Sequence, residues 1–334
     1  MTIENSYFNV QQPSQAYGSA EAQSSGYNDY QNPPSSYQSA APTPSLTAGL
    51  GNGVNLQPSY YNGGNVDFCW TLMRASPKIK SVRIEIEPTP PEPWASVQDW
   101  IPKVQRWIRE AVTNGYAVIA TYHKSTVLGT NDVAELLQAA DWWTTNYASL
   151  KTSGAFMINL MNEWGGHDIS ERDFASAYNQ AIARVRSVYN GPIIIDIPGY
   201  GQEAHTASLA VKGAANQTIT DRKIILSAHI YPNAENRRSQ RANKEMKECD
   251  IDELSSTGLA CIVGEFGDNG KSGSTPWQDL VKYAKSKHWP VLGWAWNGCG
   301  ENMNMITPQF QAFVASQTKQ YTKTSYFNKI YNQL

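Results

Sequence analysis

Residues 224–232 read Ile-Ile-Leu-Ser-Ala-His-Ile-Tyr-Pro, and seven other stretches of the same kind occur along the chain. Such a stretch is apolar, often β-branched and ends in polar side chains, which is typical of a parallel strand covered on both faces. The eight stretches are 51–56, 81–86, 117–123, 155–163, 192–199, 224–232, 260–267 and 290–297. Their starts lie about 30 to 38 residues apart, so a helix fits between successive strands.

Four of the intervening segments have helical patterns, at 97–114, 131–147, 170–189 and 275–287. The first places Trp100, Val104 and Trp107 on one stripe and stops at Gly115. Eight strands that alternate with helices predict an α/β fold of the (β/α)8 TIM-barrel type. An open, doubly wound sheet is the structural alternative, but no Gly-rich phosphate loop follows any of the strands.

The composition of the 334 residues excludes several classes of function. The formal net charge of −2 gives no attraction to nucleic acid or to an anionic membrane surface. No apolar run approaches the roughly 18 to 20 residues that span a bilayer. The four cysteines match no zinc pattern, and no other metal cluster is evident in the sequence.

Residues 1–47 differ from the rest of the chain. They are rich in Ser, Gln, Ala, Pro, Asn and Tyr and contain no Lys or Arg. Such a segment buries too little apolar area to offset the entropy of ordering, so we expect a disordered tail or linker. Four of its tyrosines, Tyr7, Tyr17, Tyr27 and Tyr37, recur at a spacing of ten, which leaves an attachment segment as the alternative. The barrel is expected to occupy residues 48–334.

The carboxyl ends of barrel strands form the usual place for an active site. The polar and aromatic residues near these ends are Arg83, His123, Asn162, Glu163, His229, Tyr231, Glu265, Trp294 and Trp296. Taken singly, each Glu could form a structural ion pair, each His could be a core residue, and one of the two Trp is expected to fill the barrel. Together, two carboxyl groups at one barrel mouth indicate acid/base chemistry.

Six short motifs occur at and near these strand ends, each once along the chain. They are Val-Arg-Ile at 82–84, Tyr-His at 122–123, Asn-Leu-Met-Asn-Glu at 159–163, His-Ile-Tyr at 229–231, Gly-Glu-Phe-Gly at 264–267 and Gly-Trp-Ala-Trp at 293–296. In this order the chain resembles glycoside hydrolase family 5, the cellulase and mannanase family, from residue 49 to about 310. The resemblance implies a retaining glycosidase without metal or cofactor, with 48–334 as its catalytic domain.

The resemblance also implies residue roles. Glu163 would be the general acid/base and Glu265 the nucleophile. The supporting active-site residues would be Arg83, His123, Asn162, His229, Tyr231 and Trp296. Trp164 stands where many family members carry Pro. The candidate platforms for sugar rings are Trp296, Trp164 and Trp94.

The chemistry of such a pair needs one protonated and one ionised carboxyl group, roughly 5 to 5.5 Å apart. We expect Arg83 and Tyr231 to keep Glu265 charged, and His229 or His123 to tune Glu163. Asn162 is expected to bond the sugar 2-hydroxyl. Three aspartates, Asp67, Asp141 and Asp196, are interpreted as structural.

The substrate is less clearly indicated. Residues 194–202, Ile-Ile-Asp-Ile-Pro-Gly-Tyr-Gly-Gln, are similar to the strand-5 segment of bacterial β-mannanases in this family. The first expectation is therefore an endo-acting hydrolase of β-1,4-mannan or glucomannan. An endo-β-1,4-glucanase is the alternative, because Trp-Asn-Gly at 296–298 also suits glucan-acting members. A non-catalytic carbohydrate-binding barrel is the alternative from another class.

The expected partner is a polysaccharide, with no nucleic acid or membrane, and the expected state is a monomer. The size of that substrate predicts an extracellular location. No secretory signal is recognised in the sequence, however, because the first basic residue is Arg74.

Overall fold

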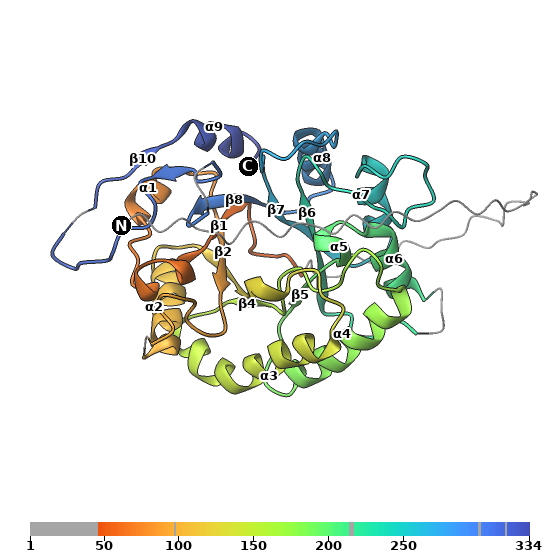
Figure 1. Ribbon diagram of the computed structural model, residues 1–334, viewed down its shortest axis with the longest axis horizontal. Coiled ribbons are helices and arrows are strands. Elements are labelled where there is room, and N and C mark those ends of the chain that lie inside the picture. Colours follow the sequence, from red (N-terminus) through yellow and green to blue (C-terminus); the bar gives the residue numbers. More distant parts are fainter. Residues whose placement is uncertain (1–45, 97, 214–216, 300–301, 318) are drawn as a thin grey trace, which may run out of the picture. The chain divides into compact units, whose positions relative to one another are not determined.

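The computed structural model describes residues 46–334 except 97, 214–216, 300, 301 and 318. In this part of the chain, eight parallel strands close into a barrel in sequence order, with helices around it (Figure 1). The prediction of a TIM barrel is confirmed. The prediction of a disordered tail over 1–47 lies outside the described residues, apart from residues 46 and 47.

The strands match the eight predicted stretches. They are β1 (Gly53–Leu56), β2 (Ser81–Ile86), β3 (Ala117–Tyr122), β4 (Met157–Asn159), β5 (Ile193–Asp196), β6 (Ile224–Ile230), β7 (Ala260–Phe266) and β8 (Val291–Asn297). A two-stranded sheet, β9 (Ile306–Thr307) with β10 (Thr322–Lys323), lies after the barrel. β4 is shorter than the predicted 155–163, because the chain leaves the strand before it reaches Glu163.

Four helices confirm the predicted helical segments: α2 (Trp100–Thr113), α3 (Val133–Leu150), α4 (Glu171–Arg186) and α8 (Trp277–Ser286). Ser170 caps α4 by accepting a hydrogen bond from the Asp173 N–H at 3.0 Å. The other α-helices are α1 (Trp70–Arg74), α5 (Pro198–Gly201), α6 (Ala204–Lys212), α7 (Glu248–Ser255) and α9 (Ser325–Tyr331). These have at most nine residues, too few turns for an apolar stripe to be recognised in the sequence.

The lower interior of the barrel is an apolar layer. It consists of Ile119, Ile194, Ile225, Ile262 and Leu292, all fully buried. Leu46 and Leu50 pack against this layer from the amino-terminal side of β1. The packing of the barrel therefore includes residue 46, which lies inside the predicted tail.

A polar layer lies above the apolar one, because strand side chains alternate with a period of two. Its members are Asn55, Arg83, Thr121, Asn159, Asp196 and Ser227, each with no exposed surface. Arg83 lies at the centre and donates to the side-chain oxygens of Asn55 at 3.0 Å and Asn159 at 2.9 Å. The residues that follow these on each strand form the mouth of the barrel.

Two strands depart from this alternation. The register between β6 and β7 shifts, so that Ala228 pairs with Val263 but His229 pairs with Glu265. The extra residue is Gly264, where a Cβ would lie 2.2 Å from Ser227 Oγ. The resulting bulge turns Glu265 into the barrel interior beside His229. β8 has a comparable shift against β1 between Gly293 and Asn297.

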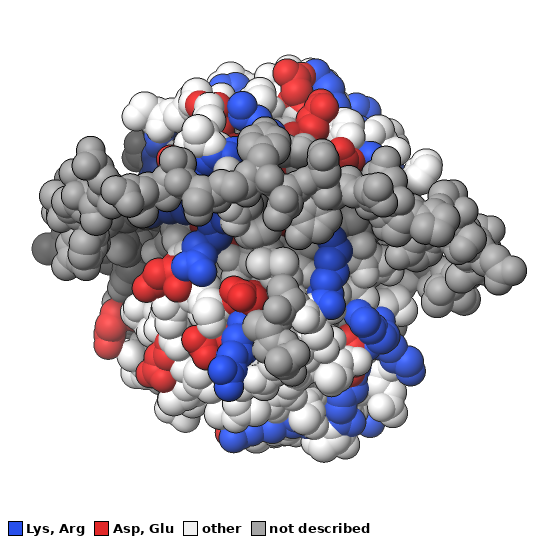
Figure 2. All heavy atoms as spheres, turned by 90° about the vertical axis from the view of Figure 1, so that its right-hand side faces the viewer, with Lys and Arg blue, Asp and Glu red and all other residues white. Residues whose placement is uncertain are grey.

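The surface agrees with the composition. None of the helices in the described ranges combines the length and apolarity that crossing a bilayer requires. Figure 2 looks onto the side of the molecule where α6 and α7 lie, and acidic and basic side chains are interspersed over the described residues of that face.

Candidate active site

Glu163 follows β4 with its backbone in the left-handed region, at φ 49°. A side chain larger than glycine is held there at a cost of about 1–3 kcal/mol, so neighbouring contacts must fix it. Two contacts do so. The Glu163 N–H donates to Asp196 Oδ2 at 3.0 Å, and its carbonyl accepts from the Gly129 N–H at 2.8 Å. The local backbone therefore sets the direction of the Glu163 carboxyl group.

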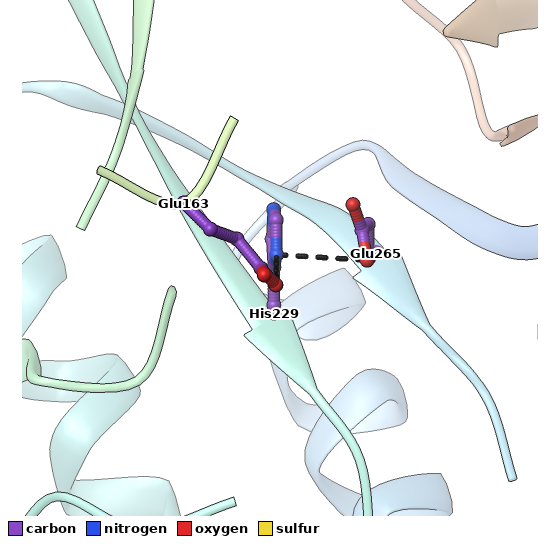
Figure 3. A group of neighbouring side chains, drawn as sticks. All are labelled: Glu163, His229 and Glu265. Atoms are coloured by element: carbon purple, nitrogen blue, oxygen red, sulfur yellow. Dashed lines mark hydrogen bonds and ion pairs between the residues drawn. The ribbon is translucent and has the colours of Figure 1, made fainter. Parts of the chain in front are cut away.

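The carboxyl groups of Glu163 and Glu265 meet at the mouth with His229 between them (Figure 3). His229 Nδ1 lies 2.8 Å from Glu163 Oε1 and 3.6 Å from Glu265 Oε2. One ligand atom from each of the three residues lies within 4.8 Å of the other two. So short a distance agrees with a retaining glycosidase, whose carboxyl groups stand about 5–5.5 Å apart, and not with an inverting one, whose carboxyl groups stand about 6.5–9.5 Å apart.

Burial raises the pKa of Glu163, and the charge of Glu265 raises it further. The hydrogen bond from His229 acts in the opposite direction. Burial alone would lower the pKa of His229, but the charges of Glu265 and Asp196 raise it well above its usual range. The three residues could hold a metal ion by distance alone. A protonated His229 opposes this, because an imidazole must lose its proton to ligate.

Glu265 is almost fully buried and accepts two hydrogen bonds. Arg83 Nη1 donates to its Oε1 and the Tyr231 hydroxyl donates to its Oε2, both at 2.8 Å. Burial and the charge of Glu265 together raise the pKa of Tyr231 well above its usual range, so this hydroxyl remains a donor. His229 and Tyr231 therefore both face the mouth together with Glu265.

Asp196 lies within the site, although the sequence analysis interpreted it as structural. It is fully buried, and its Oδ2 lies 3.3 Å from Arg83 Nη2 and 3.5 Å from His229 Nε2. Burial alone would raise the pKa of Asp196, but His229 and Arg83 hold it below its usual range. Asp196 ends an apolar strand as Glu265 does, so the same positional argument could have found it.

A second carboxyl group that the sequence analysis missed is Glu85. It lies on the same face of β2 as Arg83, forms an ion pair with it and is fully buried. Burial raises the pKa of Glu85 well above its usual range. The alternation Arg-Ile-Glu at 83–85 was the available signal, because both charged residues must share one face.

His123 lies beside Glu85 and away from Glu163. Its Nδ1 is 2.9 Å from the Tyr60 hydroxyl and 3.6 Å from Glu85 Oε2. Burial and the charge of Arg83 lower the pKa of His123 to about 3, so it is neutral. Of the two histidines expected to tune Glu163, it is His229 that contacts it.

The charged groups around Arg83 are two cations and four carboxyl groups. Two cations, Arg83 and His229, face the carboxyl groups of Glu85, Glu163, Asp196 and Glu265. If Glu85 and Glu163 hold protons, the cluster is neutral. That arrangement agrees with the raised pKa of both residues and avoids unpaired buried charge.

Two predicted sugar platforms are wrong. Trp296 is fully buried, and its Nε1–H donates to the Phe68 carbonyl at 2.9 Å. Trp164 is also fully buried, donates to the Asp132 carbonyl at 2.9 Å and stacks on Phe174. Neither ring has surface left for a ligand. Both were assigned from positions near the strand ends, and neither side-chain direction follows a simple alternation.

The other predicted residues lie as follows. Trp294 belongs to a small buried cluster against which Tyr231 packs, so this Trp and not Trp296 lies beside the site. Asn162 is almost buried, and its Oδ1 accepts from Arg83 Nη2 at 2.6 Å. Trp94 is half-buried in the loop between β2 and α2, where its backbone N–H donates to the Pro91 carbonyl.

The chain is similar in sequence and in fold to several known proteins. The chain is 24% identical over 207 residues to a mannan endo-1,4-β-mannosidase of Streptomyces lividans, a match over 61% of this chain and 52% of that protein. It therefore spans about half the length of this relative. A mannan endo-1,4-β-mannosidase of Salipaludibacillus agaradhaerens is 24% identical over 254 residues, covering 73% of this chain and 78% of that protein.

A β-mannanase from Thermomonospora fusca shares the fold, with a TM-score of 0.64 and 18% identity over 85% of this chain and 89% of that one. Residues 71–300 match the model of the cellulase family, glycosyl hydrolase family 5. Since that match covers more than half of the sequence, the chain belongs to glycosyl hydrolase family 5.

Proposed function

We propose that this protein is a retaining, endo-acting β-1,4-glycan hydrolase that cleaves β-mannan or glucomannan, with residues 48–334 as its catalytic domain. The observation that carries the proposal is the pair Glu163 and Glu265, in which one carboxyl oxygen of each residue lies within 4.8 Å of the other. The choice of mannan is supported by two relatives that are mannan endo-1,4-β-mannosidases.

In the first step Glu265 attacks the anomeric carbon while Glu163 gives its proton to the leaving oxygen. The glycosidic bond breaks, and a covalent ester joins the sugar to Glu265. In the second step Glu163, now ionised, takes a proton from water, and the oxygen of that water displaces Glu265. The two displacements together retain the configuration of the anomeric carbon.

The neighbouring residues have distinct tasks in this scheme. Arg83 and Tyr231 hold Glu265 by one hydrogen bond on each oxygen, which fixes the attacking lone pair. Arg83 also holds Asn162 by its oxygen, so the amide NH2 is left for the sugar 2-hydroxyl. Trp294 and Trp94 are the aromatic rings proposed to stack on the sugars.

A substrate panel tests the activity. Reducing sugar released from glucomannan separates an enzyme from a carbohydrate-binding barrel, and mannan, carboxymethyl-cellulose and xylan separate the substrate classes. We expect mannan and glucomannan to be cleaved fastest. Faster release from carboxymethyl-cellulose would replace the mannanase proposal by an endoglucanase.

The anomeric configuration tests the mechanism. Proton NMR of the first product should show net retention. Glu265→Ala should lose several orders of magnitude in kcat, and added azide should then give a sugar azide of inverted configuration. Glu163→Ala is the matched control, because its covalent intermediate still forms and azide should give the retained product. An inverted product from the parent enzyme would make Glu265 a base acting through water.

A further inference from the structure

A second group of polar side chains lies on the arc of the mouth from β4 to β6, outside the cluster around Arg83. It consists of His167, Tyr200 and Glu203, which come from the loop after β4 and from the segment around α5 that follows β5 (Figure 1). The hydrolytic steps proposed above use none of them.

Glu203 is a fully buried carboxyl group at the base of this arc. His167 Nδ1 lies 2.6 Å from its Oε1, and the backbone N–H groups of Arg237 and Arg238 donate to its two oxygens at 2.9 and 3.0 Å. Because a carboxylate only accepts, His167 Nδ1 donates to Glu203 and Nε2 is left for another partner. Burying a carboxylate is costly, which favours a role in fixing this imidazole.

Tyr200 is held in the left-handed region at φ 59°, between Gly199 at 66° and Gly201 at 79°. A non-glycine side chain in this conformation indicates a position that the surrounding structure enforces. Its ring lies against Gly129, where a Cβ would approach Tyr200 Cζ to 2.4 Å, and 5.8 Å from the centre of the His167 ring. Tyr200 as a whole is half-buried.

The loop that carries the general acid Glu163 also carries His167, and it is hydrogen-bonded to the segment that carries Tyr200. The Gly199 N–H donates to the Gly165 carbonyl at 2.8 Å, two residues after Glu163. Burial raises the pKa of Tyr200, and the charge of Glu163 raises it further. A sugar whose oxygen receives the proton of Glu163 must begin within hydrogen-bonding distance of the same group.

We propose that Tyr200 and His167 bind the sugar on the leaving-group side of the cleaved bond, Tyr200 by stacking and His167 by a hydrogen bond between Nε2 and a sugar hydroxyl. Glu203 is a positioning residue that holds His167 for this contact. The inference rests on the proposed function, and it assigns this arc of the mouth to the released portion of the polysaccharide.

Two substrates separate this role from catalysis. Mannohexaose places sugars on both sides of the cleaved bond, whereas 4-nitrophenyl β-mannobioside places only a phenol on the leaving side. Tyr200→Asn keeps a residue that tolerates the left-handed backbone but removes the ring. We expect this variant and His167→Ala to lose about tenfold in kcat/KM on mannohexaose, mainly through KM, and less than twofold on the aryl substrate.

The positioning role of Glu203 has its own readout. Glu203→Gln should reproduce the loss seen in His167→Ala, and the double variant should be no worse than either single one. His205 and Glu253 form a control pair with the same 2.6 Å separation on α6 and α7. His205→Ala should leave both substrates unaffected.

An equal loss on both substrates would overturn the inference, because the residues would then act through Glu163. Unchanged kinetics on mannohexaose would also overturn it. The failure of the proposed function looks different, since the parent enzyme itself would then cleave neither mannoside. In that case the same comparison with cellohexaose and 4-nitrophenyl β-cellobioside decides the inference.

Discussion

Replacing His229 by Asn should move the alkaline limb of the activity profile to higher pH. Glu163 works as an acid in its protonated form, so activity is lost as pH rises through its pKa. The charged groups that face it are His229 from β6, Glu265 from β7 and Asp196 from β5. Of these, His229 lowers the pKa of Glu163, and its removal must therefore raise it.

The size of the shift follows from the 2.8 Å contact between His229 Nδ1 and Glu163 Oε1. A hydrogen bond to a charged group contributes about 1.5–3 kcal/mol, and each pKa unit corresponds to about 1.36 kcal/mol. Loss of the contact should therefore raise the limb by about 1–2 pH units. Water that enters the vacated space reduces the effect, so one unit is the lower expectation.

The assay is kcat/KM for a soluble manno-oligosaccharide across pH, with the parent giving a bell-shaped profile whose upper limb belongs mainly to Glu163. The matched control is His123→Asn, a second histidine of the mouth, which contacts Tyr60 and Glu85. This control should leave the limb in place. A limb that stays or moves to lower pH in His229→Asn, with the melting temperature preserved, would refute the reasoning.

Three further predictions test the description of the molecule. Trp296→Phe should lower the melting temperature with KM unchanged, whereas Trp294→Ala should raise KM. The reverse result would mean that Trp296, and not Trp294, contacts the sugar. Arg83→Met should lower the free energy of unfolding by about 3–5 kcal/mol, because buried carboxylates lose their cation; denaturant titration giving less than 1 kcal/mol would contradict this. Deleting residues 1–45 should leave the melting temperature and the activity nearly unchanged, whereas deleting residues 1–50 should lower the melting temperature by several degrees. Equal effects of the two deletions would mean that the folded barrel begins elsewhere.

The fold was predictable because each strand is buried on both faces and so appears as an apolar run of its own. The carboxyl pair was predictable for a related reason. A charged residue such as Glu163 or Glu265 costs free energy at the end of an apolar run unless it is paired or has a function. Asp196 and Glu85 meet the same criterion. Glu85 lies in none of the motifs, and Asp196 lies in the segment 194–202, which was interpreted only for the choice of substrate. The sequence does not show that both would face Arg83.

Side-chain direction near an irregular strand end could not be predicted. Alternation along β8 would place Trp294 and Trp296 on one face, but the register shift between Gly293 and Asn297 separates them. The bulge at Gly264 likewise re-aims Glu265. Such irregularities depend on pairing with a neighbouring strand far away in the sequence, so the local pattern carries no record of them.

The hydrogen bonds of Arg83 also bear on how the chain acquires activity as it folds. Its partners come from β1, β2, β5 and β7 and from the segment around β4, and Glu265 is 182 residues away along the chain. Contacts of such long range form late, after most of the loop-closure entropy has been overcome. Glu265 therefore cannot be held in position for attack in a folding intermediate whose barrel has not yet closed. Recovery of enzymatic turnover during refolding should report the closing of the ring of strands, and not the earlier appearance of helices.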